Sequence, residues 1–162
     1  MNEEEASGPD GRRDILNRPS RARYDKVKHA LDLKWRRRAP QAGRMMREVV
    51  DGLWDAFGGN PWTWCGVWLP QPDGQAFQPG PARPEPAGSA TPAVGSLGDA
   101  YTAGEPRLFG TGIAVPVLDK NGRPWAAFEA KSSAPFDDMD ARWIERLFKA
   151  FQAIERPESP LP

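Results

Sequence analysis

Hydrophobic residues recur at three- and four-residue intervals in three parts of the chain, a spacing that predicts three amphipathic helices. The first runs from Ser20 to Ala39, where the following proline ends it, and its apolar face holds Val27, Leu31 and Trp35. The second ends at Gly58-Gly59, and its apolar face holds Met46, Val49, Val50, Leu53, Trp54 and Phe57. The last begins at Asp137, with Asp140 in the capping-box position, and its apolar face holds Trp143, Ile144, Leu147, Phe148, Phe151 and Ile154.

Between the second and last helices the pattern changes to one typical of β-strands. Trp62–Leu69 is rich in aromatic residues, and Pro70 closes it. Thr111–Leu118 and Arg123–Ser132 form a hairpin, because the Asn-Gly pair in the intervening turn accepts positive φ angles. These elements predict an α+β fold, in which an antiparallel sheet is covered on one face by N- and C-terminal helices.

The remaining segments set the predicted domain organisation. Residues 1–20 lack an apolar pattern and are expected to be a disordered tail, followed by a basic helix at 21–39. One domain then spans 41–155 and contains a Pro/Gly-rich loop at 71–96, with a short strand expected at Gln75–Gln78. Leu97–Ala103 is expected to form a helical turn that Gly104 stops, and 156–162 a C-terminal tail.

The charge is unevenly distributed along the chain although the formal net charge is zero. Arg12–Arg47 holds 13 basic and three acidic residues, a net charge of +10. A basic helix lying against an acidic domain explains this asymmetry best, and a nucleic-acid surface is the alternative left open. No run of about 18 apolar residues is present, and the acidic N-terminus lacks the apolar core of a signal peptide, so we expect a cytoplasmic protein without a membrane segment.

Few residues are suited to catalysis or metal binding. Cys65 is the one cysteine and His29 the one histidine, so neither a disulfide nor a metal cluster of these residues is expected. Helix capping accounts for the acidic residues near Asp137, and Gly110–Gly112 is too short for a phosphate-binding loop. We therefore predict no catalytic residue, no metal and no cofactor.

The strands instead suggest one wall of a ligand pocket. In an extended strand Trp62, Trp64, Gly66 and Trp68 face the same way, as do Trp125, Ala127, Glu129 and Lys131 of the hairpin. Aromatic walls with a few charged groups suit a small polar ligand, so the predicted ligand-binding residues are Trp64, Trp68, Trp125, Glu129 and Lys131. The alternative is a sheet face half-covered by the 71–96 loop, with both charged groups solvated.

From Met45 to Ile154 the chain resembles a GAF domain, and within that superfamily the free methionine-(R)-sulfoxide reductase branch. The resemblance rests on the tryptophan strand after an amphipathic helix, on Ile113–Gly122 with Ala126–Ser132, and on Phe136–Asp140 before a closing helix. It implies that Trp64 and Trp68 are pocket aromatics and that Glu129 replaces an aspartate that holds the ligand's ammonium group. It also implies that Lys131 replaces a second such carboxylate and that Gly112 replaces a ligand-binding glutamate.

The resemblance further implies that the reductase chemistry is absent. The family's cysteines lie between the early strands and the Ile113 strand, and Gln71–Thr111 contains none. Thiol reduction normally needs a thiolate and a second, resolving thiol, whereas Cys65 lies mid-strand on the predicted core face. The function expected is that of a bacterial, non-catalytic GAF-like domain that binds an unknown small molecule of mixed charge or acts in signalling. Two alternatives stay open: a divergent reductase that uses Cys65 with an external thiol, and a homodimerisation module that pairs through the terminal helices.

Overall fold

The structure is a computed structural model that describes residues 19–37 and 41–153. The described elements follow the order α2 (Pro19–Arg37), α3 (Ala42–Phe57), β1 (Trp62–Pro70), β2 (Ala76–Arg83), β3 (Thr91–Pro92), α4 (Gly95–Ala103), β4 (Arg107–Leu108), β5 (Gly112–Leu118), β6 (Pro124–Ser132), α5 (Asp138–Phe148) and a 3₁₀ helix, η1 (Lys149–Ala153). The predicted tails lie outside the described residues, except that Pro19 and Ser20 begin α2. No described helix combines the length and the apolar character needed to span a bilayer.

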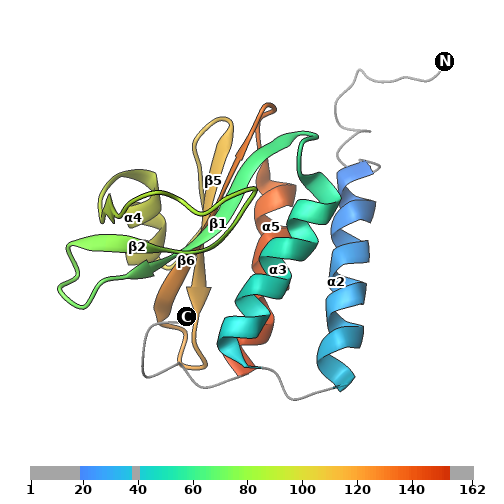
Figure 1. Cartoon of the computed structure of the whole chain (residues 1–162), viewed down its shortest axis with the longest axis horizontal. Helices are drawn as coiled ribbons and strands as arrows, with labels where there is room; N and C mark the ends of the chain where they lie inside the picture. Colours follow the sequence, from blue (N-terminus) through green and yellow to red (C-terminus); the bar gives the residue numbers. More distant parts are fainter. Residues whose placement is uncertain (1–18, 38–40, 154–162) are drawn as a thin grey trace.

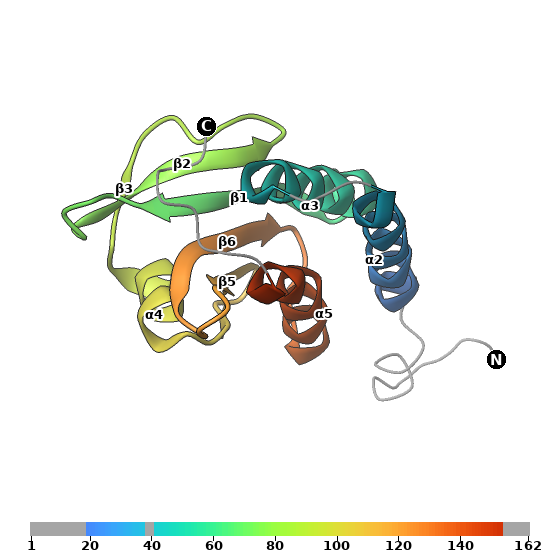
Figure 2. The ribbon, with the colours of Figure 1, turned by 90° about the horizontal axis from the view of Figure 1, so that it is seen from below.

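The described strands form one antiparallel sheet in the order β3-β2-β1-β6-β5-β4. Helices α3 and α5 cover one face of the sheet, and α2 packs on their outer side (Figures 1 and 2). The predicted α+β architecture, with terminal helices on one face, is confirmed. Helix α4 lies on the opposite face, where Ala87 and Ala93 on either side of β3 also pack, and this face therefore has a smaller core of its own.

Local sequence signals explain the boundaries of these elements. Asp137 caps α5 by accepting hydrogen bonds from the backbone N–H groups of Met139 and Asp140, and the Asp140 side chain accepts one from Asp137 in return. Gly104 ends α4 with a φ of 70°. In the β5–β6 turn the buried Asp119 carboxylate accepts hydrogen bonds from two backbone N–H groups, which fixes the hairpin connection.

The Pro/Gly-rich stretch 71–96 contains regular secondary structure, whereas we expected mostly loop. Strand β2 occupies eight of its residues, from Ala76 to Arg83, whereas we expected only Gln75–Gln78. Pairing with the edge of β1 overrides the weak strand propensity of its prolines and glycines. The stretch also supplies β3 and the first residues of α4, so it extends the sheet rather than merely covering it.

Two irregularities in strand pairing change which way two tryptophans face. Between Trp62 and Trp64, β1 advances two residues while β6 advances one, and the β5–β6 ladder is likewise shifted next to Trp125. A bulge of this kind reverses the alternation of side chains beyond it. Trp62 and Trp125 therefore lie in the core beneath the helices, not on the predicted pocket face.

Polar and aromatic contacts hold α2 in place. Tyr24 is fully buried, stacks on Trp143 at 6.1 Å, and donates a hydrogen bond of 2.8 Å to Asp140 at the start of α5. Arg23 donates to the carbonyl groups of Ala56 and Asn60 at the end of α3. The inner face of the basic helix thus completes the core of the same chain.

Candidate ligand-binding site

A hollow of about 530 Å³ lies on the α4 side of the sheet. Trp68 of β1 and Glu129 and Lys131 of β6 line it, together with the segment Ala87–Thr91 and the start of α4. Glu129 and Lys131 face the same way because they are two residues apart on one strand. Three of the five predicted ligand-binding residues therefore meet at one hollow.

Trp68 positions the carboxylate of Glu129. Its side chain is 6% exposed, and its indole N–H donates a hydrogen bond of 2.9 Å to Oε1 of Glu129 on the neighbouring strand. Glu129 is half-buried and Lys131 exposed, and neither forms an ion pair with any other described residue. Within the part of the chain that the structure describes, the hollow thus presents one acidic and one basic group without an ion-pair partner.

Trp64 lies just outside the lining of this hollow. Its ring is 6.2 Å from that of Trp68, and the Lys131 ammonium group lies 5.7 Å from the centre of the Trp64 ring. The Trp64 indole N–H donates a hydrogen bond of 3.1 Å to the carbonyl oxygen of Glu85, two residues before the lining segment. Trp64 therefore supports the wall and the adjoining segment, whereas we expected it to be part of the wall.

Trp125 is a correction to the predicted site. It is 5% exposed in the core on the opposite face of the sheet, where its ring packs 6.2 Å from that of Phe151. The shift in pairing next to it is the cause, since strict alternation would have placed it on the same face of β6 as Glu129. Trp125 accordingly contributes to stability and is separated from the hollow by the sheet.

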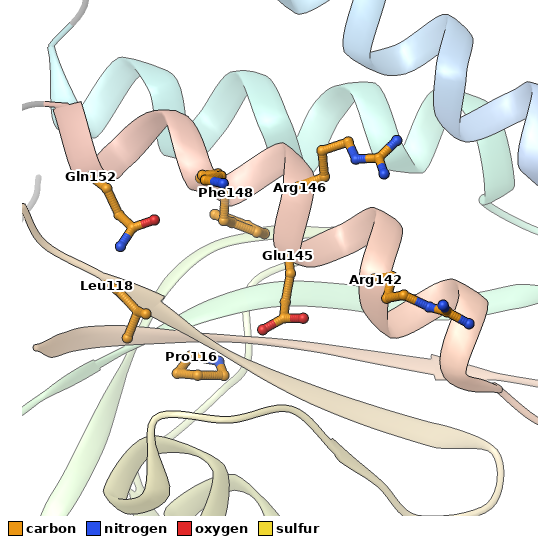
Figure 3. Close-up of a pocket in the computed structure, with 8 residues that line it drawn as sticks. Pro116, Leu118, Arg142, Glu145, Arg146, Phe148 and Gln152 are labelled. Atoms are coloured by element: carbon orange, nitrogen blue, oxygen red, sulfur yellow. The ribbon is translucent and has the colours of Figure 1, made fainter. Parts of the chain in front are cut away.

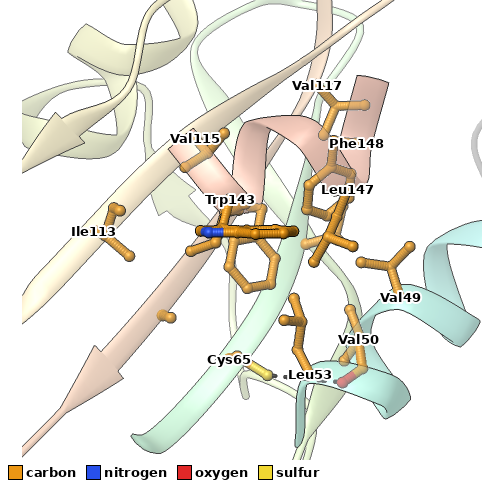
Figure 4. Close-up of a cluster of buried hydrophobic side chains, with 14 of the residues drawn as sticks. Val49, Val50, Leu53, Cys65, Ile113, Val115, Val117, Trp143, Leu147 and Phe148 are labelled. Atoms are coloured by element: carbon orange, nitrogen blue, oxygen red, sulfur yellow. Dashed lines mark hydrogen bonds between the residues drawn. The ribbon is translucent and has the colours of Figure 1, made fainter. Parts of the chain in front are cut away.

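Cys65 also lies on the helix side of the sheet, as the alternation predicts (Figure 4). It is fully buried, and its Sγ contacts the carbonyl oxygen of Val50 at 4.0 Å. Burial and, to a lesser extent, the nearby Asp51 carboxylate raise the pKa of the Cys65 thiol to about 12. At neutral pH this thiol is protonated and faces away from the hollow, so it is poorly placed for redox chemistry there.

No protein-family model and no curated protein sequence matches the chain, but several solved structures do. The free methionine-R-sulfoxide reductase from Neisseria meningitidis, in complex with its substrate, is 21% identical over 82% of this chain and 86% of its own, with a TM-score of 0.64. The substrate complex of fRMsr from Staphylococcus aureus is 16% identical over 80% of this chain and 94% of its own, with a TM-score of 0.69. A protein described as a GAF sensor from Burkholderia vietnamiensis is 16% identical, covers 83% of this chain and 94% of its own, and has a TM-score of 0.69. The chain has the GAF fold. At these identities the likeness establishes the GAF fold and leaves the activity open.

Several residues that line the hollow of this GAF fold were not among the residues predicted from the sequence. Phe109 and Val94 line its mouth, and Ser96 and Leu97 contribute from α4. Phe109 precedes the Gly-Thr-Gly stretch, and no periodic pattern includes it, so only the tertiary structure could bring it to the same hollow as Glu129. Gly112, which the resemblance matches to a ligand-binding glutamate, is covered by the ring of Phe109.

A second hollow, of about 360 Å³, lies between α5 and the outer edge of β5 (Figure 3). Glu145 points toward Pro116 at its centre, and burial, followed by the nearby Glu105, raises the pKa of Glu145. Arg142 of α5 and Lys149, the first residue of η1, flank it, and both residues are exposed. No predicted site residue lies in this hollow.

Among the described residues, no group of three or more His, Cys, Asp or Glu side chains is arranged to hold a metal ion.

Proposed function

We propose that this chain is a non-catalytic GAF domain that binds a small ligand of mixed charge in the hollow lined by Trp68, Glu129 and Lys131. The observation that carries the proposal is the hydrogen bond from Trp68 to Glu129, because it fixes one carboxylate oxygen and leaves the other for a ligand. A ligand with a donor or cationic group for Glu129 and an anionic group for Lys131 complements this pair.

The position of the 71–96 stretch supports the same proposal. Residues Ala87–Thr91 line the hollow together with Glu129 and still leave a space of about 530 Å³, which is within the range of small-molecule sites. A stretch that filled this face would instead have favoured a purely structural role. The alternative of a reductase that uses Cys65 is weakened because the thiol lies on the opposite face of the sheet.

Thermal-shift screening against zwitterionic metabolites, nucleotides and organic acids tests the proposal. We expect a ligand that raises the Tm of the native protein, and a reduced shift in Glu129→Gln and in Lys131→Gln. Lys26→Gln is the matched control, since Lys26 is exposed on α2. A ligand whose effect is the same in all three variants would contradict the proposed site.

The apolar stripes of the second and last helices, which would pair two copies in a homodimer, are largely covered within the chain, although Trp54 is only half-buried. Phe57, Trp143 and Phe151 are each 9% exposed or less, and α2 packs over α3 and α5. Four expectations from the sequence remain predictions. They are a homodimer through the terminal helices, a cytoplasmic location, a bacterial signalling role and the absence of nucleic-acid binding. Sedimentation at micromolar concentration tests the homodimer, and a monomer would exclude it at that concentration.

A further inference from the structure

The ring of Phe109 lies against the backbone of Gly112 at the mouth of the hollow. A Cβ atom placed on Gly112 would lie 2.0 Å from Cε2 of Phe109, so the ring occupies the space that any side chain at position 112 would need. The backbone N–H of Phe109 also donates a hydrogen bond of 3.0 Å to the carbonyl oxygen of Gly112, which holds the two residues together. Because Gly112 has no side chain, the Phe109 ring can lie against its backbone, and this ring forms part of the wall of the hollow.

Exposed apolar side chains gather around the same opening. Among the described residues, the large hydrophobic side chains that are exposed are Leu33, Val94, Leu108 and Phe109. Val94, at 72% exposure, and Phe109, at 36%, both line the hollow. Apolar groups that gather at one concave site, rather than lying singly over the surface, are typical of a binding surface.

We propose that the ligand carries an aromatic or other flat apolar body that stacks on Phe109 and lies against Val94. This inference rests on the proposed function, since the charged end of the same ligand is to be held by Glu129 and Lys131. Phe109 then determines specificity for the apolar body, and Lys131 and Glu129 determine specificity for charge. A small zwitterion without a ring fills only the charged side of the hollow and leaves Phe109 and Val94 exposed to water.

Fluorescence titration with anilinonaphthalene sulfonate tests the aromatic contact. This probe combines aromatic rings with an anionic group and an N–H donor, which match the three features of the hollow. We expect saturable binding by the native protein and an affinity about three- to tenfold lower in Phe109→Ala, the size of effect that one aromatic pair contributes. Leu33→Ala is the matched control, because Leu33 is 43% exposed but lies on α2.

Two further measurements separate this contact from non-specific adsorption. Gly112→Ala leaves Phe109 in the sequence but forces its ring to move, so we expect it to weaken probe binding as Phe109→Ala does. We also expect para-aminomethylbenzoate to displace the probe at lower concentration than aminohexanoate, which carries the same two charges without a ring. Circular dichroism checks that each variant is folded.

The outcomes distinguish this inference from the proposed function. Absence of saturable probe binding, or equal affinity in the native protein, Phe109→Ala and Leu33→Ala, would overturn the aromatic contact. Affinity lost in Glu129→Gln and Lys131→Gln but kept in Phe109→Ala would also overturn it and leave the proposed function intact. Affinity lost in Phe109→Ala alone would support the aromatic contact and count against the charged pair.

Discussion

The indole N–H of Trp68 on β1 donates a hydrogen bond of 2.9 Å to Oε1 of Glu129 on β6. The two residues are diagonal neighbours across the ladder, because Trp68 pairs with Ala127 and Glu129 pairs with Gly66. The Trp64 ring and the Ala82 Cβ fill the space above Gly66, and the Trp68 side chain reaches the carboxylate diagonally from its own position. This contact defines how the hollow presents its acidic group.

Replacing Trp68 with phenylalanine should remove this hydrogen bond and keep most of the ring packing. We expect a loss of about 1.5–3 kcal/mol in the free energy of unfolding, the usual contribution of a hydrogen bond to a charged group. Urea denaturation provides the measurement. Trp54→Phe is the matched control, since the Trp54 ring is half-buried but no hydrogen bond of its indole N–H is found in the described part of the chain. Equal stability of Trp68→Phe and the native protein would contradict the role assigned to the bond.

Trp64→Phe should loosen the segment that lines the hollow. The variant loses the hydrogen bond to the Glu85 carbonyl group but retains an aromatic ring beside Lys131. We expect faster amide hydrogen exchange at Ala87–Ala90, with exchange in β5 unchanged. Unchanged exchange at Ala87–Ala90, measured by mass spectrometry on peptides that cover them, would show that Trp64 does not hold the segment.

Gly66→Ala should destabilise the protein, because a Cβ atom there would lie 2.7 Å from both the Trp64 ring and the Ala82 Cβ. The expected cost is about 1–3 kcal/mol, typical of overpacking. Gly88→Ala is the control, since nothing lies within 4 Å of its added Cβ. Denaturant midpoints should fall in the first variant and stay within error in the second, and equal midpoints would be evidence against close packing at Gly66.

Cys65 should resist alkylation in the folded protein. Burial raises the pKa of its thiol from 9.0 to about 12, so the reactive thiolate is scarce at pH 8. Because the folded-state pKa is raised, this group's contribution to stability is present below pH 9 and is lost as the pH rises toward 12. Mass spectrometry should find little iodoacetamide adduct at pH 8 without urea and complete modification with urea. Rapid modification of the folded protein would revive the reductase alternative.

Tyr24→Phe should weaken the attachment of α2 to α5 by a pH-dependent amount. Burial raises the pKa of Asp140, and the hydrogen bond from Tyr24 opposes that rise by favouring the charged carboxylate. The Asp140 pKa is therefore lower with Tyr24 than without it. The native protein should thus exceed Tyr24→Phe in free energy of unfolding at higher pH, and this difference should shrink as Asp140 becomes protonated. Stability curves of both proteins between pH 3 and pH 7 should converge at low pH, and a constant difference would contradict this coupling.

The sequence predicted the elements that depend on local patterns. The spacing of apolar residues in α3 and α5, the capping box at Asp137 and the Asn-Gly turn each depend on residues close together in the chain. Side-chain alternation alone also placed Trp68, Glu129 and Lys131 on one face, and it separated them from Cys65. These inferences needed only regular helix and strand geometry.

Tertiary structure decided the rest. The shifts in strand pairing beside Trp62 and Trp125 moved both rings to the helix side, and a bulge depends on the register between strands rather than on either strand alone. Strand β2 formed because the edge of β1 offered hydrogen bonds, despite its proline and glycine content. Phe109 came beside the hollow because the bare backbone of Gly112 left space for its ring, a contact that no spacing in the sequence encodes. Local patterns thus specified the strands and the charged pair, and packing between distant segments specified which aromatic residues line the hollow.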